Sequence, residues 1–287
     1  MVVGAGRGPL VEASRKAAHE VRKTVRIFAV EKNPNAVITL KTIKEQKWGG
    51  DIGTEFAVVE VIACDMREWE APQKADIVVS ELLGSFGDNE LSPECLDGVW
   101  SYVKETAISI PSSYTSYLAP IQSQRLYSEA SQQRDRALPI YSAFETGYVV
   151  YMRNYFPIAK PKPLFTFNHN NLLLKPSERD NSRHKSLEFV TEVDAVLHGF
   201  AGYFETTLFG DITLSTVPQT HTPGMFSWFP IYFPVHSPIL IESQQKMNVH
   251  FWRLVNKRQI WYEWCLSEPI PTSIHNPNGR TYSIGLM

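Results

Sequence analysis

The sequence predicts an α/β unit with a parallel, doubly wound sheet, followed by an antiparallel β unit that forms a sandwich or a barrel. Three observations indicate this. Short apolar runs alternate with helical patterns up to about residue 111, whereas later segments alternate apolar and polar residues. Five of the 19 prolines lie in the first 115 residues and fourteen in the remaining 172. Four of the seven tryptophans follow residue 225.

The first unit is predicted from apolar runs separated by helices. The expected strands are Met1–Val3, Val25–Val30, Phe56–Ala63, Asp76–Ser80 and Ala107–Ile110. Pro9 suits the first turn of a helix. The expected buried face of that helix is the ladder Leu10, Ala13, Ala17 and Val21. Asn33 and Pro34 form the cap and first turn of a second helix, which runs through Ile43.

The second unit shows strand periodicity. Leu187–Leu197 has apolar residues at the odd positions Leu187, Phe189, Val193 and Leu197. Met247–Val255 and Gln259–Leu266 are aromatic-rich runs joined by three polar residues, which predicts a hairpin. Between these strands and the first unit, Arg125–Leu138 is polar and compatible with a helix, so we expect an excursion from the β unit there.

Composition limits the classes of function. The 287 residues carry 28 basic and 30 acidic side chains, a net charge of −2, so no bulk basic surface is expected for nucleic acid. No apolar run reaches about 18 residues and no secretory signal is recognisable, so we expect no membrane span. Three distant cysteines and eight histidines without paired ligand spacing predict a reducing, intracellular compartment and no metal site.

A glycine-rich loop follows the first expected strand. Gly4, Gly6 and Gly8 alternate with other residues, and glycines at such a turn let a ligand lie against bare backbone. Because position 9 is proline, the third glycine of Gly-x-Gly-x-x-Gly, which packs helix on strand in a dinucleotide site, is missing. Glu31 ends the second expected strand, where a carboxylate accepts hydrogen bonds from both ribose hydroxyls.

A second acidic position follows the next strand. Asp65 is expected to accept a hydrogen bond from an exocyclic amine, and Met66 to lie flat against a purine. Glycine loops and acidic strand ends are individually common and often only solvated. Together, Gly4, Gly6, Glu31, Asp65 and Met66 favour an adenosyl ligand, and S-adenosylmethionine over NAD. A NAD-type oxidoreductase stays open as an alternative, supported only by the glycine loop and Glu31.

Two glutamates lie nine residues apart in the segment Ser80–Glu90. This segment begins at the carboxyl end of an expected strand, the edge where open α/β sheets bind ligands. Gly84 and Gly87 let the chain fold back so that Glu81 and Glu90 face one another. Two converging carboxylates repel, and a planar guanidinium relieves that repulsion because its N–H donors match carboxylates in pairs. The alternative is two exposed loop acids.

These residues resemble the protein arginine methyltransferases. Ser80-Glu81 through Glu90 is similar to the double-glutamate loop of that family, and the Val-x-Gly-x-Gly-x-Gly start is similar to its cofactor loop. The resemblance is strongest to the type II branch, which forms symmetric dimethylarginine, and it covers essentially the whole chain. The segments that carry it are Glu31–Pro34, Asp65–Trp69, Leu91–Asp97, His198–Glu205 and Ile274–Pro277.

The resemblance implies a Rossmann-like S-adenosylmethionine-binding domain over residues 1–111. It also implies an antiparallel β-barrel substrate-binding domain over 112–287, with a dimerisation excursion near 123–145. Glu81 and Glu90 are then the catalytic residues and hold the substrate guanidinium, and Glu81 also borders the cofactor. They would draw positive charge toward the nitrogens they contact and leave a lone pair on the third nitrogen, which attacks the methyl group in line.

An aromatic loop is the second implied substrate site. Where asymmetric enzymes of the family carry Thr-His-Trp, this chain has Phe226-Ser227-Trp228-Phe229. By resemblance, Trp228 packs on the substrate arginine and the backbone of Phe229 holds the substrate chain. From the residues alone, both would be barrel core.

The resemblance also implies the wider biology. The expected products are mono- and symmetric dimethylarginine on Arg-Gly-rich segments such as histone tails and Sm proteins. A homo-oligomer acting in cytoplasm and nucleus, with a role in chromatin regulation, is expected as well.

The chain departs from the family at its start, three residues before Gly4. Family members carry an upstream segment that closes over the cofactor, and the larger member has an N-terminal barrel that docks a WD-repeat partner. We therefore expect weak S-adenosylmethionine binding. The alternative to an enzyme is a catalytically impaired fragment that acts as an oligomerisation or interaction module.

Overall fold

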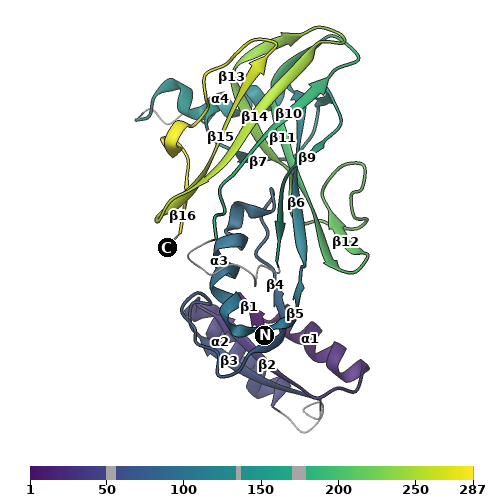
Figure 1. The fold of residues 1–287 in the computed structure, drawn as a ribbon, viewed down its shortest axis with the longest axis vertical. Coiled ribbons are helices and arrows are strands. Elements are labelled where there is room, and N and C mark those ends of the chain that lie inside the picture. Colours follow the sequence, from purple (N-terminus) through teal and green to yellow (C-terminus); the bar gives the residue numbers. More distant parts are fainter. Residues whose placement is uncertain (50–55, 134–136, 170–178, 287) are drawn as a thin grey trace.

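The computed structural model describes residues 1–49, 56–133, 137–169 and 179–286. The chain forms two stacked units, with the α/β unit below the antiparallel unit in Figure 1. The helices are α1 (Pro9–Glu20), α2 (Pro34–Ile43), α3 (Ser92–Val99) and α4 (Gln124–Gln132). Short helical turns form at η1 (Lys44–Trp48), η2 (Asp88–Glu90), η3 (Trp100–Tyr102), η4 (Ile140–Phe144) and η6 (Pro277–Gly279).

The first unit is a parallel sheet in the order β3-β2-β1-β4-β5, which confirms the predicted doubly wound α/β architecture. Its strands are β1 (Val2–Val3), β2 (Val25–Glu31), β3 (Ala57–Ala63), β4 (Ala75–Ser80) and β5 (Val103–Ile110). The strand order reverses between β1 and β4. Ligands of such sheets bind in the crevice outside the carboxyl ends at that point.

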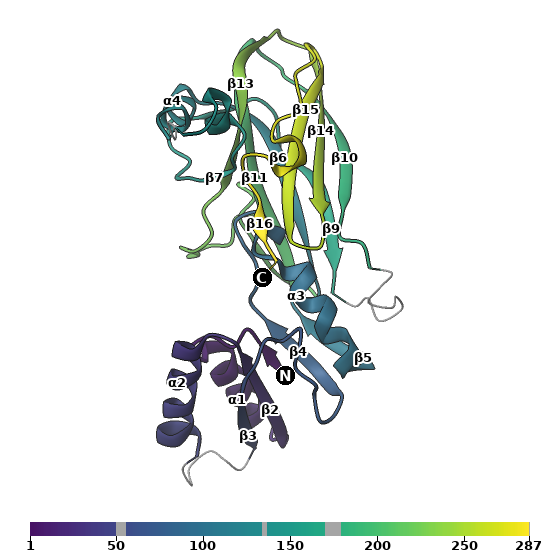
Figure 2. The same ribbon diagram turned by 90° about the vertical axis from the view of Figure 1, so that its left-hand side faces the viewer.

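Helices cover both faces of this sheet (Figure 2). On one face, Val11 of α1, Leu40 of α2 and Trp48 of η1 pack with β-strand residues into one apolar cluster. On the other face, Leu96 of α3 and Trp100 of η3 pack into a second cluster. Asn33 caps α2 as predicted, because its Oδ1 accepts a hydrogen bond from the Asn35 N–H at 3.0 Å.

The face predicted for α1 is wrong. Val11 and Ala18 are its buried residues, whereas Ala13 and Ala17 are exposed and Val21 is 64% exposed. The true face was hidden because polar Ser14 lies between the two buried positions. The Ser14 hydroxyl donates to the Leu10 carbonyl at 2.8 Å, so it needs no solvent on that face.

The second unit consists of two antiparallel sheets packed around one core. The larger sheet has the order β7-β13-β11-β6-β8, with β12 paired to β11 and β9 to β6, and the smaller has the order β10-β14-β15-β16. Residues of both sheets share a single apolar cluster, which confirms the barrel-like arrangement. The strands are β6 (Ser113–Gln122), β7 (Tyr148–Val149), β8 (Phe156–Pro157), β9 (Lys162–Asn168), β10 (Arg183–Val190), β11 (Ala195–Phe209), β12 (Ile212–Ser215), β13 (Ile231–Ile241), β14 (Lys246–Val255), β15 (Gln259–Glu268) and β16 (Ile284–Gly285).

One predicted strand of this unit is wrong and one hairpin is confirmed. Leu187–Leu197 is not continuous, because β10 ends at Val190 and β11 begins at Ala195. Val193 lies in the turn between them, 47% exposed, where the Thr191 hydroxyl is 3.3 Å from the Val193 N–H. The β14–β15 hairpin is formed as expected, with its last described pair joining Val255 to Ile260.

The expected excursion contains a helix. α4 begins after Ser123, whose hydroxyl accepts a hydrogen bond from the Leu126 N–H at 3.3 Å. Within the predicted range 125–138, positions 134–136 lie outside the described residues. Among the helices of the described ranges, none is long and apolar enough to cross a membrane.

Candidate active site

The predicted site residues of the first unit meet at one edge of the parallel sheet. The glycine loop follows β1, Glu31 ends β2, Asp65 follows β3 and Glu81 follows β4. Because all four strands run in the same direction, these positions share the carboxyl edge, where the strand order reverses.

The glycine loop presents bare backbone to this edge. Gly4 and Gly6 have φ values of 65° and 55°, a region that side chains rarely adopt. A Cβ on Gly4 would lie 3.1 Å from Leu82 Cδ2 and 3.4 Å from Met66 Cε, so Met66 is brought to the loop. Gly8, with φ 91°, has a packing role of its own, since its Cβ would lie 2.9 Å from the Trp48 ring.

Glu31 is positioned by backbone donors. Its Oε2 accepts a hydrogen bond from the Gly6 N–H at 2.8 Å, and its Oε1 accepts one from the Asn33 N–H at 2.7 Å. The residue is only 9% exposed. Each carboxylate oxygen has a second lone pair, so the side chain is oriented and still has acceptor capacity for two hydroxyls.

Asp65 is held by a residue that the sequence analysis missed. Arg67 donates from its backbone N–H and Nε to Asp65 Oδ1, at 2.9 and 3.0 Å, and from Nη2 to Oδ2 at 2.7 Å. These hydrogen bonds hold the pKa of Asp65 well below its usual range, so the group is ionised. The Asp-x-Arg spacing is the only local signal for this pair.

The double-glutamate segment folds back as a tight hairpin, as predicted. Gly84 and Gly87 exchange two backbone hydrogen bonds, of 3.1 and 2.9 Å. Gly87 has φ 83°, and a Cβ there would lie 2.7 Å from the Tyr114 ring. The Asn89 side chain closes the loop by accepting a hydrogen bond from the Phe86 N–H at 2.7 Å.

Glu90 lies within the electrostatic influence of Glu81. Partial burial raises the pKa of Glu81, and partial burial together with the charge of Glu81 raises the pKa of Glu90. Both side chains remain accessible to water. No cation is bonded to either carboxylate among the described contacts, so the pair is suited to receive one from outside.

The hairpin is buried in the barrel. Leu83 and Phe86 belong to the barrel core cluster, and Phe86 is fully buried among Phe233, Phe251 and Tyr262. Gly202 of β11 makes room for this ring, because a Cβ there would lie 2.7 Å from Phe86 Cδ2.

Trp228 and Phe229 lie on the barrel side of the site. Trp228, at φ 61°, donates from Nε1 to the Leu83 carbonyl at 2.7 Å, which places it against the glutamate hairpin. Phe229 is separated from the core, since its ring packs on the exposed Tyr151 ring at 4.4 Å. The structure thus brings Trp228 to the backbone of the glutamate hairpin, whereas the Phe229 ring packs on Tyr151, a surface aromatic that the sequence analysis missed.

Asp88 is the most deeply buried acid of the hairpin, and sequence reasoning gave it no role. Its Oδ2 accepts hydrogen bonds from Arg253 Nε at 2.5 Å and from the Tyr262 hydroxyl at 2.6 Å. Arg253 also forms a two-bond fork with Glu94, at 2.8 and 2.9 Å. Asp88 and Arg253 are both fully buried. No local pattern signals this pair, because 165 residues separate its members.

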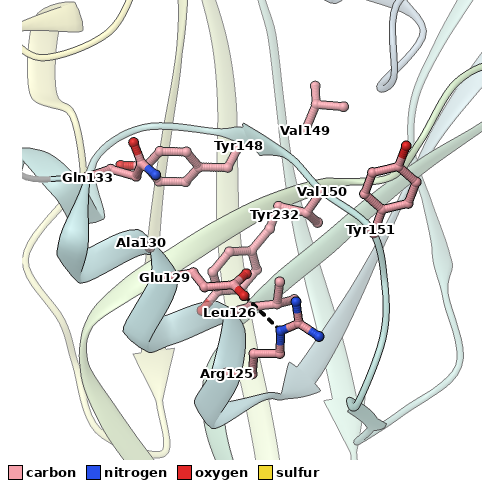
Figure 3. A pocket seen from close by; sticks show the side chains of 10 residues that line it. All are labelled: Arg125, Leu126, Glu129, Ala130, Gln133, Tyr148, Val149, Val150, Tyr151 and Tyr232. Atoms are coloured by element: carbon pink, nitrogen blue, oxygen red, sulfur yellow. Dashed lines mark hydrogen bonds and ion pairs between the residues drawn. The ribbon is translucent and has the colours of Figure 1, made fainter.

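A cavity of about 260 Å³ lies beside α4 (Figure 3), and no residue of the glutamate hairpin lines it. It is lined by α4 residues, by the segment Tyr148–Tyr151 and by Tyr232. The Tyr151 ring, which lines this cavity, also packs on the Phe229 ring. Within the described part of the chain, no cluster of His, Cys, Asp and Glu side chains could hold a metal ion.

Comparison with known proteins agrees with this geometry. Residues 1–110 match the family model "PRMT5 arginine-N-methyltransferase", and residues 113–284 match "PRMT5 oligomerisation domain". Protein arginine N-methyltransferase 5 of Xenopus laevis is 51% identical over all of this chain and 44% of its own length. The Oryza sativa subsp. indica protein of that name is 49% identical over all of this chain and 42% of its own length.

A solved structure gives the same fold. The Trypanosoma brucei PRMT1 enzyme–prozyme heterotetrameric complex with AdoHcy aligns with a TM-score of 0.75 at 16% identity. The alignment covers 99% of this chain and 86% of that chain. This chain spans less than half the length of the two curated relatives named above. From the family models and the full-chain identity, it belongs to the PRMT5 family of arginine N-methyltransferases.

Proposed function

We propose that this chain carries the catalytic site of an S-adenosylmethionine-dependent protein arginine N-methyltransferase. The observation that carries the proposal is the Glu81–Glu90 hairpin, with two water-accessible carboxylates at the ligand-binding edge of the sheet. Partial burial and the charge of Glu81 raise the pKa of Glu90, and a cationic substrate would offset the effect of that charge. A guanidinium fits this need, because it is planar, always charged and rich in N–H donors.

The residues of the glycine loop fit the proposed cofactor. Gly4 and Gly6 offer bare backbone, Glu31 has free acceptor capacity for ribose hydroxyls, and Met66 lies beside the loop. Asp65 is ionised and would accept from an adenine amine with the lone pairs that Arg67 leaves free. The related trypanosome complex was solved with AdoHcy, which supports the same ligand class here.

The chain's own contribution is positioning and charge. Held by the glycine loop and Glu31, S-adenosylmethionine would supply an electrophilic methyl group, with the neutral thioether as its leaving group. Glu81 and Glu90 hold two nitrogens of the guanidinium and draw positive charge toward them, so the third nitrogen keeps electron density for the attack. That nitrogen loses one proton, which water at the open side of the carboxylates accepts. Trp228 would cover the guanidinium plane.

The finer specificity is part of the proposal. We propose mono- and symmetric dimethylarginine as products, of the type II class, on Arg-Gly-rich segments such as histone tails and Sm proteins. Support comes from the Phe226–Phe229 loop, which differs from the Thr-His-Trp loop of asymmetric enzymes. Glycine beside arginine lets the side chain enter a narrow site, and Phe229 would hold the substrate chain.

Substitution of the two glutamates tests the proposal. Glu81→Gln and Glu90→Gln should each lower methyl transfer to an Arg-Gly peptide by about 10³-fold, because the neutral amide no longer attracts the guanidinium. S-adenosylhomocysteine binding, measured by calorimetry, should persist in Glu90→Gln. Glu60→Gln, on the surface of β3, is the matched control and should retain turnover. Full activity in both test variants would refute the assignment, and mass spectrometry of the product distinguishes mono-, symmetric and asymmetric methylation.

We also propose a homo-oligomer and a cytoplasmic and nuclear location. The name of the matched oligomerisation domain and the heterotetramer of the trypanosome relative support the assembly. The excursion near 123–145 is the proposed contact, and it carries an exposed Ile140. Ile140→Glu should lower the mass measured by light scattering; an unchanged mass would exclude this contact. A WD-repeat partner, as in the larger family member, belongs to the same set of proposals.

A further inference from the structure

The hairpin that presents the two glutamates is anchored from the other unit of the molecule. Asp88, two residues before Glu90, points away from the site into the barrel. Arg253 of β14 and Tyr262 of β15 donate to its Oδ2, at 2.5 and 2.6 Å. Ser116 of β6 donates its only proton to the Phe86 carbonyl at 2.7 Å, and its oxygen lies 3.2 Å from Asp88 Oδ1.

The same guanidinium fixes the chain on the far side of Glu90. Arg253 Nη1 and Nη2 donate to the two oxygens of Glu94, at 2.8 and 2.9 Å, in the first turn of α3. Nη1 also donates to the Asn181 carbonyl at 3.1 Å. One buried cation therefore bonds the acids at positions 88 and 94, which bracket Glu90.

The backbone between the two acids has little freedom. Asp88–Glu90 forms a single 3₁₀ turn, and the Leu91 N–H donates to the Asp88 carbonyl at 3.2 Å. Leu91 has φ 66°, a conformation that a side-chain-bearing residue adopts only where its surroundings impose it. Because Asp88 and Glu94 are both bonded to Arg253, the backbone between them sets the direction of the Glu90 side chain.

We propose that Arg253 is a positioning residue, which fixes Glu90 opposite Glu81 through its bonds to Asp88 and Glu94. The inference rests on the proposed methyltransferase function. A buried charge fork is a costly way to obtain stability alone, because apolar side chains of similar size would serve as well. A fork has defined directions, which suits the placement of a catalytic carboxylate.

The decisive comparison uses Arg253→Met and Arg183→Met in the full chain. Arg183 of β10 is the direct cross-strand neighbour of Arg253 and touches no residue of the hairpin among the described contacts. We expect Arg253→Met to lower kcat for an Arg-Gly peptide by about 100-fold, the effect of a displaced catalytic group. The affinity for S-adenosylhomocysteine and the KM for the peptide should change by less than about threefold. Arg183→Met should retain kcat.

A more conservative variant tests the proposal if Arg253→Met does not fold. Asp88→Asn keeps the shape of the side chain and removes its charge, and it should lower kcat by about tenfold. Wild-type kcat in folded Arg253→Met or in Asp88→Asn would overturn the proposal. Equal losses in Arg253→Met and Arg183→Met would overturn it as well, because the effect would then be a general one on the barrel.

Hydrogen exchange separates this proposal from the proposed function. The amides of Gly87 and Leu91 should exchange faster in Arg253→Met than in wild type, whether or not methyl transfer occurs. If wild type transfers no methyl group but these amides lose protection, the function is refuted and the anchoring of the hairpin stands. Unchanged exchange at both amides would overturn the anchoring itself.

Discussion

The candidate site has a cofactor half, around Glu31 and Asp65, and a glutamate half, the hairpin that carries Glu81 and Glu90. Different kinds of contact hold the two halves in place. Glu31 takes its hydrogen bonds from Gly6 and Asn33, and Asp65 takes most of its own from Arg67 two residues later. All of these donors belong to the α/β unit. The glutamate hairpin instead depends on barrel residues that follow it by up to 174 positions.

This difference shows which part of the fold determines the geometry of each half of the site. The cofactor half is built from loops that directly follow strands, so its geometry comes with the parallel sheet. The glutamate half is correct only when the barrel has formed beneath it. Binding of the cofactor and turnover should therefore respond to different substitutions. The following four experiments test this separation and the contribution of the hairpin to stability.

Phe86→Ala should have the largest effect on stability. The ring is fully buried in the barrel core, so its removal should lower the free energy of unfolding by about 3–5 kcal/mol. Chemical denaturation measures this, and Phe226→Ala, at a residue 87% exposed, should change stability by less than about 0.5 kcal/mol. A loss below about 1 kcal/mol for Phe86→Ala would show that the hairpin is not integral to the barrel.

Glu31→Gln should weaken the cofactor half alone. Loss of a charged acceptor for the ribose hydroxyls costs about 1.5–3 kcal/mol, which corresponds to about 10–100-fold in the dissociation constant of S-adenosylhomocysteine. The exchange rates of the Gly87 and Leu91 amides should stay at their wild-type values. Calorimetry and hydrogen exchange on the same sample check both statements. Wild-type affinity would remove Glu31 from the cofactor site.

Acid should separate the two halves. Burial and the charge of Glu81 raise the pKa of Glu90, and burial raises the pKa of Glu81. Both carboxylates are therefore protonated as the pH falls through these raised values, and below them kcat/KM should fall by at least about tenfold per pH unit. Asp65 stays ionised because Arg67 holds its pKa well below the usual range. Protonation of Asp65 should therefore not weaken cofactor binding over the same pH range. Parallel acid losses in both quantities would contradict the separation.

The smallest effect concerns stability at neutral pH. Folding raises the carboxyl pKa of Glu81 above its ordinary value of 4.5, so the folded state binds the proton more tightly than the unfolded state. The ionised group therefore opposes folding above that raised value, and the penalty disappears as the pH falls below 4.5. Glu81→Gln should raise the melting temperature at pH 7 by a few degrees at most, about 1–3 °C, and leave it unchanged in acid. A lower melting temperature at pH 7 would show a stabilising role.

Much of the fold and the cofactor edge could be predicted because their signals are local. Strand–helix alternation predicts the parallel sheet, and acids that directly follow strands must meet at its carboxyl edge. Gly84 and Gly87 predict the fold-back of the hairpin, since one of them adopts a positive φ.

The remaining features depend on contacts that no local pattern records. The ladder Leu10 to Val21 is as regular as the true face of α1, and only the packing partners decide between them. Val193 continues an alternation that Thr191 interrupts with a turn. Asp88 looks like any loop acid until Arg253, 165 residues later, is placed beside it.

Gly202 shows what this arrangement means for exchanging parts between relatives. The missing side chain of Gly202 in β11 leaves space in the barrel, and the Phe86 ring fills it. Phe86 precedes the domain boundary near residue 111, whereas Gly202 follows it. A chimera that joins the α/β unit of one protein to the barrel of another would therefore bring together a ring and a hole that were not selected as a pair. A functional chimera should transfer the barrel together with residues 83–94, because these residues pack against the barrel although they precede it in the sequence.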